Sequence, residues 1–139
     1  MVAKSKRPQA ERAAEWAMLI NFGCDHTRRA RRAKFAKVDF FGADIIGLRW
    51  DGGKLWVQVT TGQTAAVLTR RRKLEQYPWH PSDRVFVWQL VERQDVANPR
   101  RKAWTFRVWE YELRDGTREW TDQREPIVVQ REWFKAYKE

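Results

Sequence analysis

Apolar and polar residues alternate along several stretches of the chain, and this pattern predicts a fold built largely on β-strands. The clearest pair is the apolar run 44–48 and the alternating run 55–60, which flank the step Asp51-Gly52. An Asp-Gly step between two apolar runs favours a tight β-hairpin, because such turns need positive φ at their centre. We therefore predict two antiparallel strands that are joined at Asp51-Gly52.

The second strand of this hairpin directs its side chains alternately to two faces. One face is aliphatic, and the other carries Gln58 and Thr60. A hairpin brings the start of its first strand close to the end of its second, so we expect Asp44 to lie near Gln58 and Thr60. One carboxylate and two further oxygen-bearing side chains then converge at one end of a sheet. This convergence is a candidate site for a metal ion or a phosphodiester.

Residues 8–22 have the spacing of a helix that packs on this sheet. Glu11 suits the positive N-terminal end of the helix dipole, and Gly23 is a natural stop. The residues expected to face the core are Ala13, Trp16, Ala17 and Ile20.

A second helix is expected over residues 64–76, capped by a Thr or Gln side chain. Its predicted inner face carries Ala65, Leu68 and Leu74, and it contains the basic run Arg70-Arg71-Arg72-Lys73.

The C-terminal half of the chain alternates again over residues 84–93 and 103–113. Both faces of the first stretch are largely apolar, which indicates a central strand. The step Asp115-Gly116 predicts a turn after the second stretch. A short edge strand over residues 126–130 and a short helix over 131–138 complete the expected α/β fold.

The chain has 139 residues, with 28 Lys and Arg against 18 Asp and Glu, for a formal net charge of +10. This length suits a single domain over residues 1–139, with a basic arm at 1–7 that we expect to be disordered. A compact basic domain usually binds a polyanion, so nucleic acid is the expected partner.

A single cysteine excludes an internal disulfide, and no apolar run is long enough for a membrane span. We expect a cytoplasmic protein of a bacterium or a phage-infected cell, with a homodimer left open.

Basic side chains precede the candidate site and recur on the second helix. Runs of charge are often merely solvated, but the first run adjoins the candidate site, which favours contact with phosphates. The residues expected to contact nucleic acid are Arg28, Arg29, Arg31, Arg32, Lys34, Lys37, Arg70, Arg71 and Arg72.

An Asp-led strand, a hairpin and a second strand ending in Gln58-Val59-Thr60 resemble the PD-(D/E)XK nuclease superfamily, which includes archaeal Holliday-junction resolvases and many phage nucleases. Asp44 stands where the family has its motif Asp, and Gln58-Val59-Thr60 stands where acid-x-Lys is expected. The opening segment AERAAEWAMLINFG is similar to the first helix of resolvase-like members, whose Glu completes the metal site. Glu11 matches that Glu better than Glu15 does. The resemblance implies a restriction-endonuclease-like core with extra C-terminal β-strands.

The same resemblance implies metal-assisted hydrolysis of nucleic-acid phosphodiester bonds, with DNA as the favoured substrate. Mg²⁺ or Mn²⁺ would be held by Asp44, the side-chain oxygen of Gln58, the Val59 carbonyl and Glu11. Thr60 replaces the Lys of the family. Some members carry the catalytic Lys on the following helix instead, and Lys73 is a candidate for such a displaced cation, as is Arg70 or Arg71.

Several alternatives remain open at this point. Glu11 also suits a simple interaction with the helix dipole, and Asp39 is a second acid close to the same strand. Gln58 contributes no negative charge, so a related fold that binds nucleic acid without cutting it is a competing interpretation. A phage factor that binds a host protein is a third.

Overall fold

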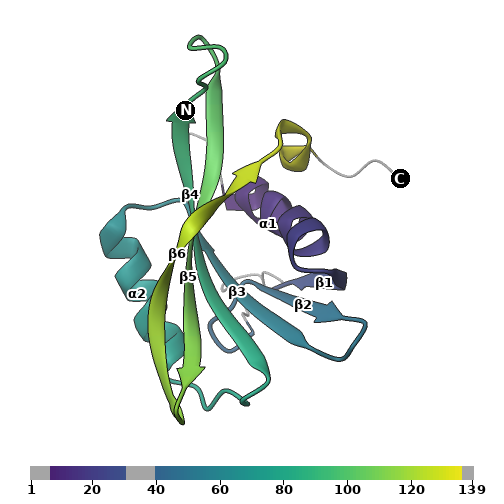
Figure 1. Cartoon of the computed structure of the whole chain (residues 1–139), viewed down its shortest axis with the longest axis vertical. Helices are drawn as coiled ribbons and strands as arrows, with labels where there is room; N and C mark the ends of the chain where they lie inside the picture. The colour runs from purple at the N-terminus through teal and green to yellow at the C-terminus, as the bar shows by residue number, and fades with distance from the viewer. Residues whose placement is uncertain (1–6, 31–39, 136–139) are drawn as a thin grey trace, which may run out of the picture.

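The predicted alternation produces one sheet of six strands in the computed structural model, which describes residues 7–30 and 40–135. The strands are β1 (Cys24–Arg29), β2 (Ile45–Arg49), β3 (Lys54–Thr60), β4 (Asp83–Gln94), β5 (Lys102–Arg114) and β6 (Thr117–Val129). Two α-helices, α1 (Arg7–Asn21) and α2 (Thr64–Glu75), and a 3₁₀-helix η1 (Arg131–Phe134) accompany them (Figure 1). The strands lie in sequence order, and only β3 and β4 are parallel. The protein is therefore an α/β protein with a mixed sheet.

The two helices cover opposite faces of the sheet (Figure 1). Parallel neighbours cannot be joined by a hairpin, so the step from β3 to β4 needs a crossover, and α2 supplies it. The helix α2 packs on β3 and β4, whereas α1 packs on β1, β2 and β3. One face of β1 and β2 therefore lies beside α2 and is not covered by it.

Each helix has its own hydrophobic core against the sheet. Under α1, small side chains allow a close approach: Ala10, Ala13, Ala14 and Ala17 are all buried. Gly47 in β2 contributes to this approach, because a Cβ there would lie 2.4 Å from Met18 Cε. The core under α2 is smaller and consists of Ala43, Val67, Leu74, Val85, Val87 and Trp109.

The helix positions agree with the predicted ranges to within a residue, but parts of their predicted faces are wrong. In α2 the buried residues are Val67 and Leu74, whereas Ala65 and Leu68 are exposed. Four consecutive apolar residues open this helix, so periodicity alone does not decide which of them turns to the sheet. In α1, Ile20 is exposed in the last turn.

The turn before β6 forms at Asp115 and Gly116 as predicted, and both have positive φ. The predicted short strand at 126–130 is instead the end of the 13-residue strand β6. Pro126 is compatible with β6 because this strand lies at the sheet edge, where a missing N–H need not break the ladder. The predicted helix at 131–138 is only the four-residue η1, with residues 136–138 outside the described part of the chain.

Three further expectations concern the N-terminal arm, the cap of α2 and a membrane span. Of the arm expected at residues 1–7, residues 1–6 lie outside the described residues, and Arg7 already belongs to α1. The predicted N-terminal capping side chain of α2 is absent, since the cap residue Gln63 makes no side-chain hydrogen bond there. Neither described α-helix is long and apolar enough to cross a membrane.

Candidate functional site

A tight turn delivers Asp44 to the sheet. Phe40 and Ala43 exchange two backbone hydrogen bonds of 2.9 Å, and the two residues between them have positive φ, 51° at Phe41 and 89° at Gly42. Positive φ at both central residues is the requirement of a type I′ turn, and it is uncommon for a bulky residue such as Phe41. A Cβ on Gly42 would lie 3.3 Å from Leu74 Cδ2, so the turn packs tightly against the end of α2.

Asp44 is buried, and hydrogen bonds hold both its side chain and its backbone. Its side chain is 1% exposed, and its Oδ2 accepts a hydrogen bond of 2.9 Å from the Val59 N–H. Its backbone N–H donates to the Val57 carbonyl at 2.9 Å, and its carbonyl accepts from Ala30 N–H at 2.7 Å. Asp44 therefore connects β1 to β3 at the start of β2.

Gln58 lies beside Asp44 and is equally buried. The β2–β3 ladder ends at the pair of Ile45 and Val57, and Asp44, just before it, bonds to the backbone of Val57 and Val59, the two neighbours of Gln58 in β3. Gln58 is 1% exposed, and neither its amide nitrogen nor its amide oxygen has a hydrogen-bond partner among the described residues. The indole N–H of Trp56, two residues earlier on the same face, is also buried without a partner. Because buried polar groups are nearly always hydrogen-bonded, this unpaired amide needs an explanation.

Thr60 completes the predicted trio, but its hydroxyl is already engaged. Thr60 is buried, and its Oγ1 accepts a hydrogen bond of 3.0 Å from Gly62 N–H. The Gly62 carbonyl accepts in turn from Gln89 Nε2 at 2.8 Å. Thr60 thus shapes the exit from β3 toward α2, and no positive charge stands at this position.

Lys73 reaches the same turn from α2. A Cβ at Gly42 would lie 3.4 Å from Lys73 Cγ, so the stem of this lysine passes along the turn that precedes Asp44. The other basic residues of this helix differ in orientation. Arg71 stacks over the Trp120 ring at 5.1 Å, Arg72 is exposed, and Arg70 is half-buried. Lys73 is therefore the basic residue of α2 whose stem the structure places along the turn before Asp44.

The two glutamates of α1 lie along β1. Glu15 accepts a hydrogen bond from Thr27 Oγ1 and pairs with Arg29, with 2.7 Å between Oε1 and Nε. Since α1 and β1 run in opposite directions around the turn at Gly23, Glu11 lies one helical turn further toward the end of β1. That end is where Ala30 N–H meets the Asp44 carbonyl. Glu11 is thus on the α1 side of the sheet, whereas Gln58 follows Trp56 on the side that α2 covers.

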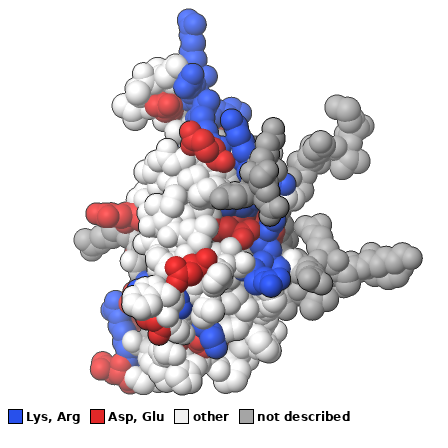
Figure 2. Space-filling model, turned by 90° about the vertical axis from the view of Figure 1, so that its right-hand side faces the viewer, with Lys and Arg blue, Asp and Glu red and all other residues white. Residues whose placement is uncertain are grey.

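The basic residues expected to meet phosphates are only partly described. Arg28 and Arg29 are exposed on β1, while Arg31, Arg32, Lys34 and Lys37, as well as Asp39, fall in residues 31–39, outside the described residues. A further basic group was not predicted, and its members are Arg93, Arg100, Arg101 and Lys102 near the β4–β5 loop. Figure 2 shows Lys and Arg side chains gathered at this projecting end of the molecule and below it.

An aromatic cluster beside Asp44 was also missed. Phe41 and Trp79 pack against Trp56 with ring centroids 6.0 Å and 5.1 Å away, and Tyr77 lies 5.6 Å from Phe41. The abundance of Trp in the sequence signals aromatic packing in general, but the place of this cluster depends on the positive φ of Phe41, which no pattern of apolar residues reveals.

The ligand chemistry of the site is limited to oxygen atoms of few residues. Within the described ranges, no group of three or more His, Cys, Asp or Glu residues is placed to hold a metal ion. A metal at this point would therefore depend on the Asp44 carboxylate together with neutral amide and carbonyl oxygens, which Mg²⁺ and Mn²⁺ accept as ligands. No protein-family model, curated protein or solved structure matches this chain.

Proposed function

We propose that this chain is a metal-dependent, endonuclease-like protein that acts on the phosphodiester bonds of nucleic acid, with DNA as the first substrate class. The observation that carries the proposal is the Gln58 amide, which is buried without a hydrogen-bond partner among the described residues. Its two neighbours in β3, Val57 and Val59, both bond to the buried Asp44. A divalent ion bound to the carboxylate and to the amide oxygen would give that oxygen its missing partner.

The order of the elements supports a restriction-endonuclease-like core. The resemblance implies a first helix with a glutamate, a first strand, an Asp-led strand, a strand with the polar pair and a helix that packs on the sheet. The chain has α1, β1, β2, β3 and α2 in these places, and Asp44 directly precedes β2. The strands β5 and β6 extend the sheet beyond this part.

The residues present fit a weakly bound Mg²⁺ or Mn²⁺. Asp44 and the Gln58 oxygen would hold the ion, with the Val59 carbonyl as a further oxygen ligand. Glu11 is on α1, which covers the face of the sheet opposite to Gln58. When bound, such an ion polarises the phosphate and lowers the pKa of an attacking water. The Val59 N–H keeps the Asp44 carboxylate in one orientation, through the bond of 2.9 Å. Lys73 would supply, from α2, the positive charge that Thr60 lacks.

A second candidate function is binding of nucleic acid without cleavage. It is favoured by the burial of Asp44 and Gln58, both 1% exposed, because a phosphate cannot reach them unless the surrounding turn moves. The Thr60 hydroxyl is also held by Gly62 N–H and is not free to act on a substrate. In that case the basic surface would serve binding alone.

The test combines metal binding with cleavage for the wild type, Asp44→Asn and the control Asp51→Asn. Asp51 is an exposed acid of the same hairpin, so its replacement changes the net charge equally without touching the site. We expect millimolar Mn²⁺ to raise the Tm of the wild type and of Asp51→Asn but not of Asp44→Asn, and the same two proteins to cut DNA. If all three bind DNA and none cuts it with either metal, the second candidate function is correct. If none of them binds DNA or RNA at low salt, both candidates are wrong.

A further inference from the structure

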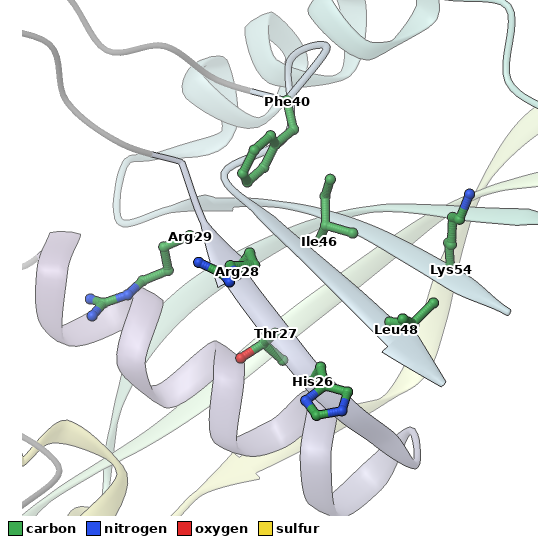
Figure 3. A pocket seen from close by; sticks show the side chains of 8 residues that line it. All are labelled: His26, Thr27, Arg28, Arg29, Phe40, Ile46, Leu48 and Lys54. Atoms are coloured by element: carbon green, nitrogen blue, oxygen red, sulfur yellow. The ribbon is translucent and has the colours of Figure 1, made fainter. Parts of the chain in front are cut away.

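A pocket of about 700 Å³ opens on the face of β1 and β2 that α2 leaves uncovered. Its floor is apolar and consists of Ile46 and Leu48. His26, Arg28 and Lys54 stand around the floor, and Phe40 closes one end (Figure 3). The pocket thus combines an apolar base with a cationic rim.

The strand register places this pocket directly next to the candidate site. Leu48 pairs with His26 on one side and Lys54 on the other, and Ile46 forms the next row with Arg28 and Trp56. Gln58 follows Trp56 on the same face of β3. Since alternate residues of a strand are about 7 Å apart, the row of Ile46 and Trp56 lies about that distance from Gln58.

The cations of the rim are available to a ligand. Arg28 and Lys54 are both exposed and form no ion pair with any described residue. Arg29, the neighbour of Arg28, turns instead to α1, where Glu15 binds it (Figure 3). Two unpaired cations over an apolar floor are complementary to a ligand that has a flat apolar body and an attached anion.

We infer that this pocket binds an unpaired nucleotide of the nucleic acid on which the proposed site acts. The base would lie on Ile46 and Leu48 against the Phe40 ring, and its phosphate would lie between Arg28 and Lys54. Bases inside a duplex are stacked on each other and cannot enter such a pocket, so the substrate class is single-stranded or splayed nucleic acid. This inference rests on the proposed function, because it assigns the substrate of the same site.

The first experiment compares Leu48→Glu with the control Leu113→Glu. Both leucines are 40% exposed and lie in strands, but Leu113 is in β5, away from the pocket. Fluorescence polarisation would measure binding of a single strand, a splayed fork and a blunt duplex of equal length. We expect Leu48→Glu to weaken binding of the first two about fivefold or more, the effect of losing one stacked base, and to leave the blunt duplex nearly unchanged. Leu113→Glu should change none of the three.

A second experiment uses the wild-type protein and does not depend on any variant being folded. A single strand that carries 5-iodouracil is irradiated in the complex, and the crosslinked peptide is identified by mass spectrometry. We expect crosslinks to Phe40 or His26.

Crosslinks confined to the β4–β5 loop, or equal losses for all three DNAs in Leu48→Glu, would overturn the pocket assignment while the proposed function stands. An absence of any binding to nucleic acid would overturn both.

Discussion

Replacing Gln58 with Met is expected to make the protein more stable and to remove its response to metal ions. Gln58 is fully enclosed, and both polar atoms of its amide lack a partner. Met has a similar length and an unbranched, adaptable side chain, so it can fill the same space without the polar atoms. Few single substitutions in a core are expected to stabilise a protein, which makes the direction of this change informative.

The magnitude follows from the unpaired amide. A buried donor or acceptor without a partner costs about 1–3 kcal/mol of folding free energy. Strain from repacking can take away part of the gain, since swaps that conserve volume usually cost less than about 1.5 kcal/mol. We therefore expect Gln58→Met to raise the free energy of unfolding by about 1 kcal/mol in metal-free buffer, which corresponds to a rise of about 3–5 °C in Tm for a chain of this size.

The matched control is Gln89→Met in the neighbouring strand β4. Gln89 pairs with Thr60 in the register, but its amide donates a hydrogen bond of 2.8 Å to the Gly62 carbonyl. Its replacement removes a satisfied hydrogen bond and should lower the free energy of unfolding by about 1 kcal/mol. The two variants thus apply one chemical change to an unpaired and a paired amide.

Urea unfolding with and without 10 mM Mn²⁺ would measure both effects. A bound ion stabilises the folded state by RT ln(1 + [L]/Kd), so the wild type should gain stability with Mn²⁺ and Gln58→Met should not. A loss of more than about 1 kcal/mol in metal-free Gln58→Met would show that the amide is satisfied in the folded protein, for example by water, and would refute the reasoning.

Two further predictions follow from the turn before β2 and from the single thiol. Gly42→Ala should lower the free energy of unfolding, measured with urea, by about 1–2 kcal/mol, which is more than Gly52→Ala should. Both glycines have φ near 90°, but only a Cβ on Gly42 would lie against Leu74, at 3.3 Å. Equal losses in the two variants would show that this contact with α2 is unimportant. Burial raises the pKa of the Cys24 thiol, so the unfolded chain loses this proton at a lower pH than the folded chain does. The stabilising contribution is therefore complete below the ordinary thiol pKa of about 8.5 and declines above it, and unfolding measured from pH 7 to 10 should show a steeper decline for the wild type than for Cys24→Ala.

The sequence predicts the hairpin of β2 and β3 well because the signal is local. The turn residues Asp51 and Gly52 and the alternation in β3 are set by neighbours within a few positions, and Gly52 has the required φ of 90°. The same alternation correctly separates the α1-facing side of β3 from the side that carries Gln58. Strand phase alone therefore predicts which side of β3 carries Gln58, whereas the contact of Asp44 with the β3 backbone depends on the turn that precedes β2.

Features that depend on distant parts of the chain could not be predicted in the same way. The face of α2 that turns to the sheet is set by the packing of Val67 and Leu74 in one cluster with Ala43, from the turn before β2, and with Val85 and Val87 of β4. The pocket on one face of β1 and β2 exists because the crossover helix α2 packs on β3 and β4 and leaves that face uncovered. Neither fact is encoded in a local pattern, and the same holds for the missing partners of the Gln58 amide, since a sequence shows which groups are polar but not which are satisfied.

Among the described residues, the buried Asp44 side chain has a hydrogen-bond partner and the buried Gln58 amide has none. This difference is the physical reason for proposing metal chemistry ahead of nucleic-acid binding alone. The burial of the Asp44 carboxylate is offset by the Val59 N–H, which is the kind of support that a purely structural carboxylate needs. Gln58 has no such support, although a Met or Leu side chain at this position would fill the core without an unsatisfied amide. A protein that used this end of the sheet only as scaffold would gain stability by losing the amide. A buried, unpaired oxygen close to a fixed carboxylate is instead a potential ligand for a hard cation, and in the proposed function the binding of the ion would offset the cost of keeping it.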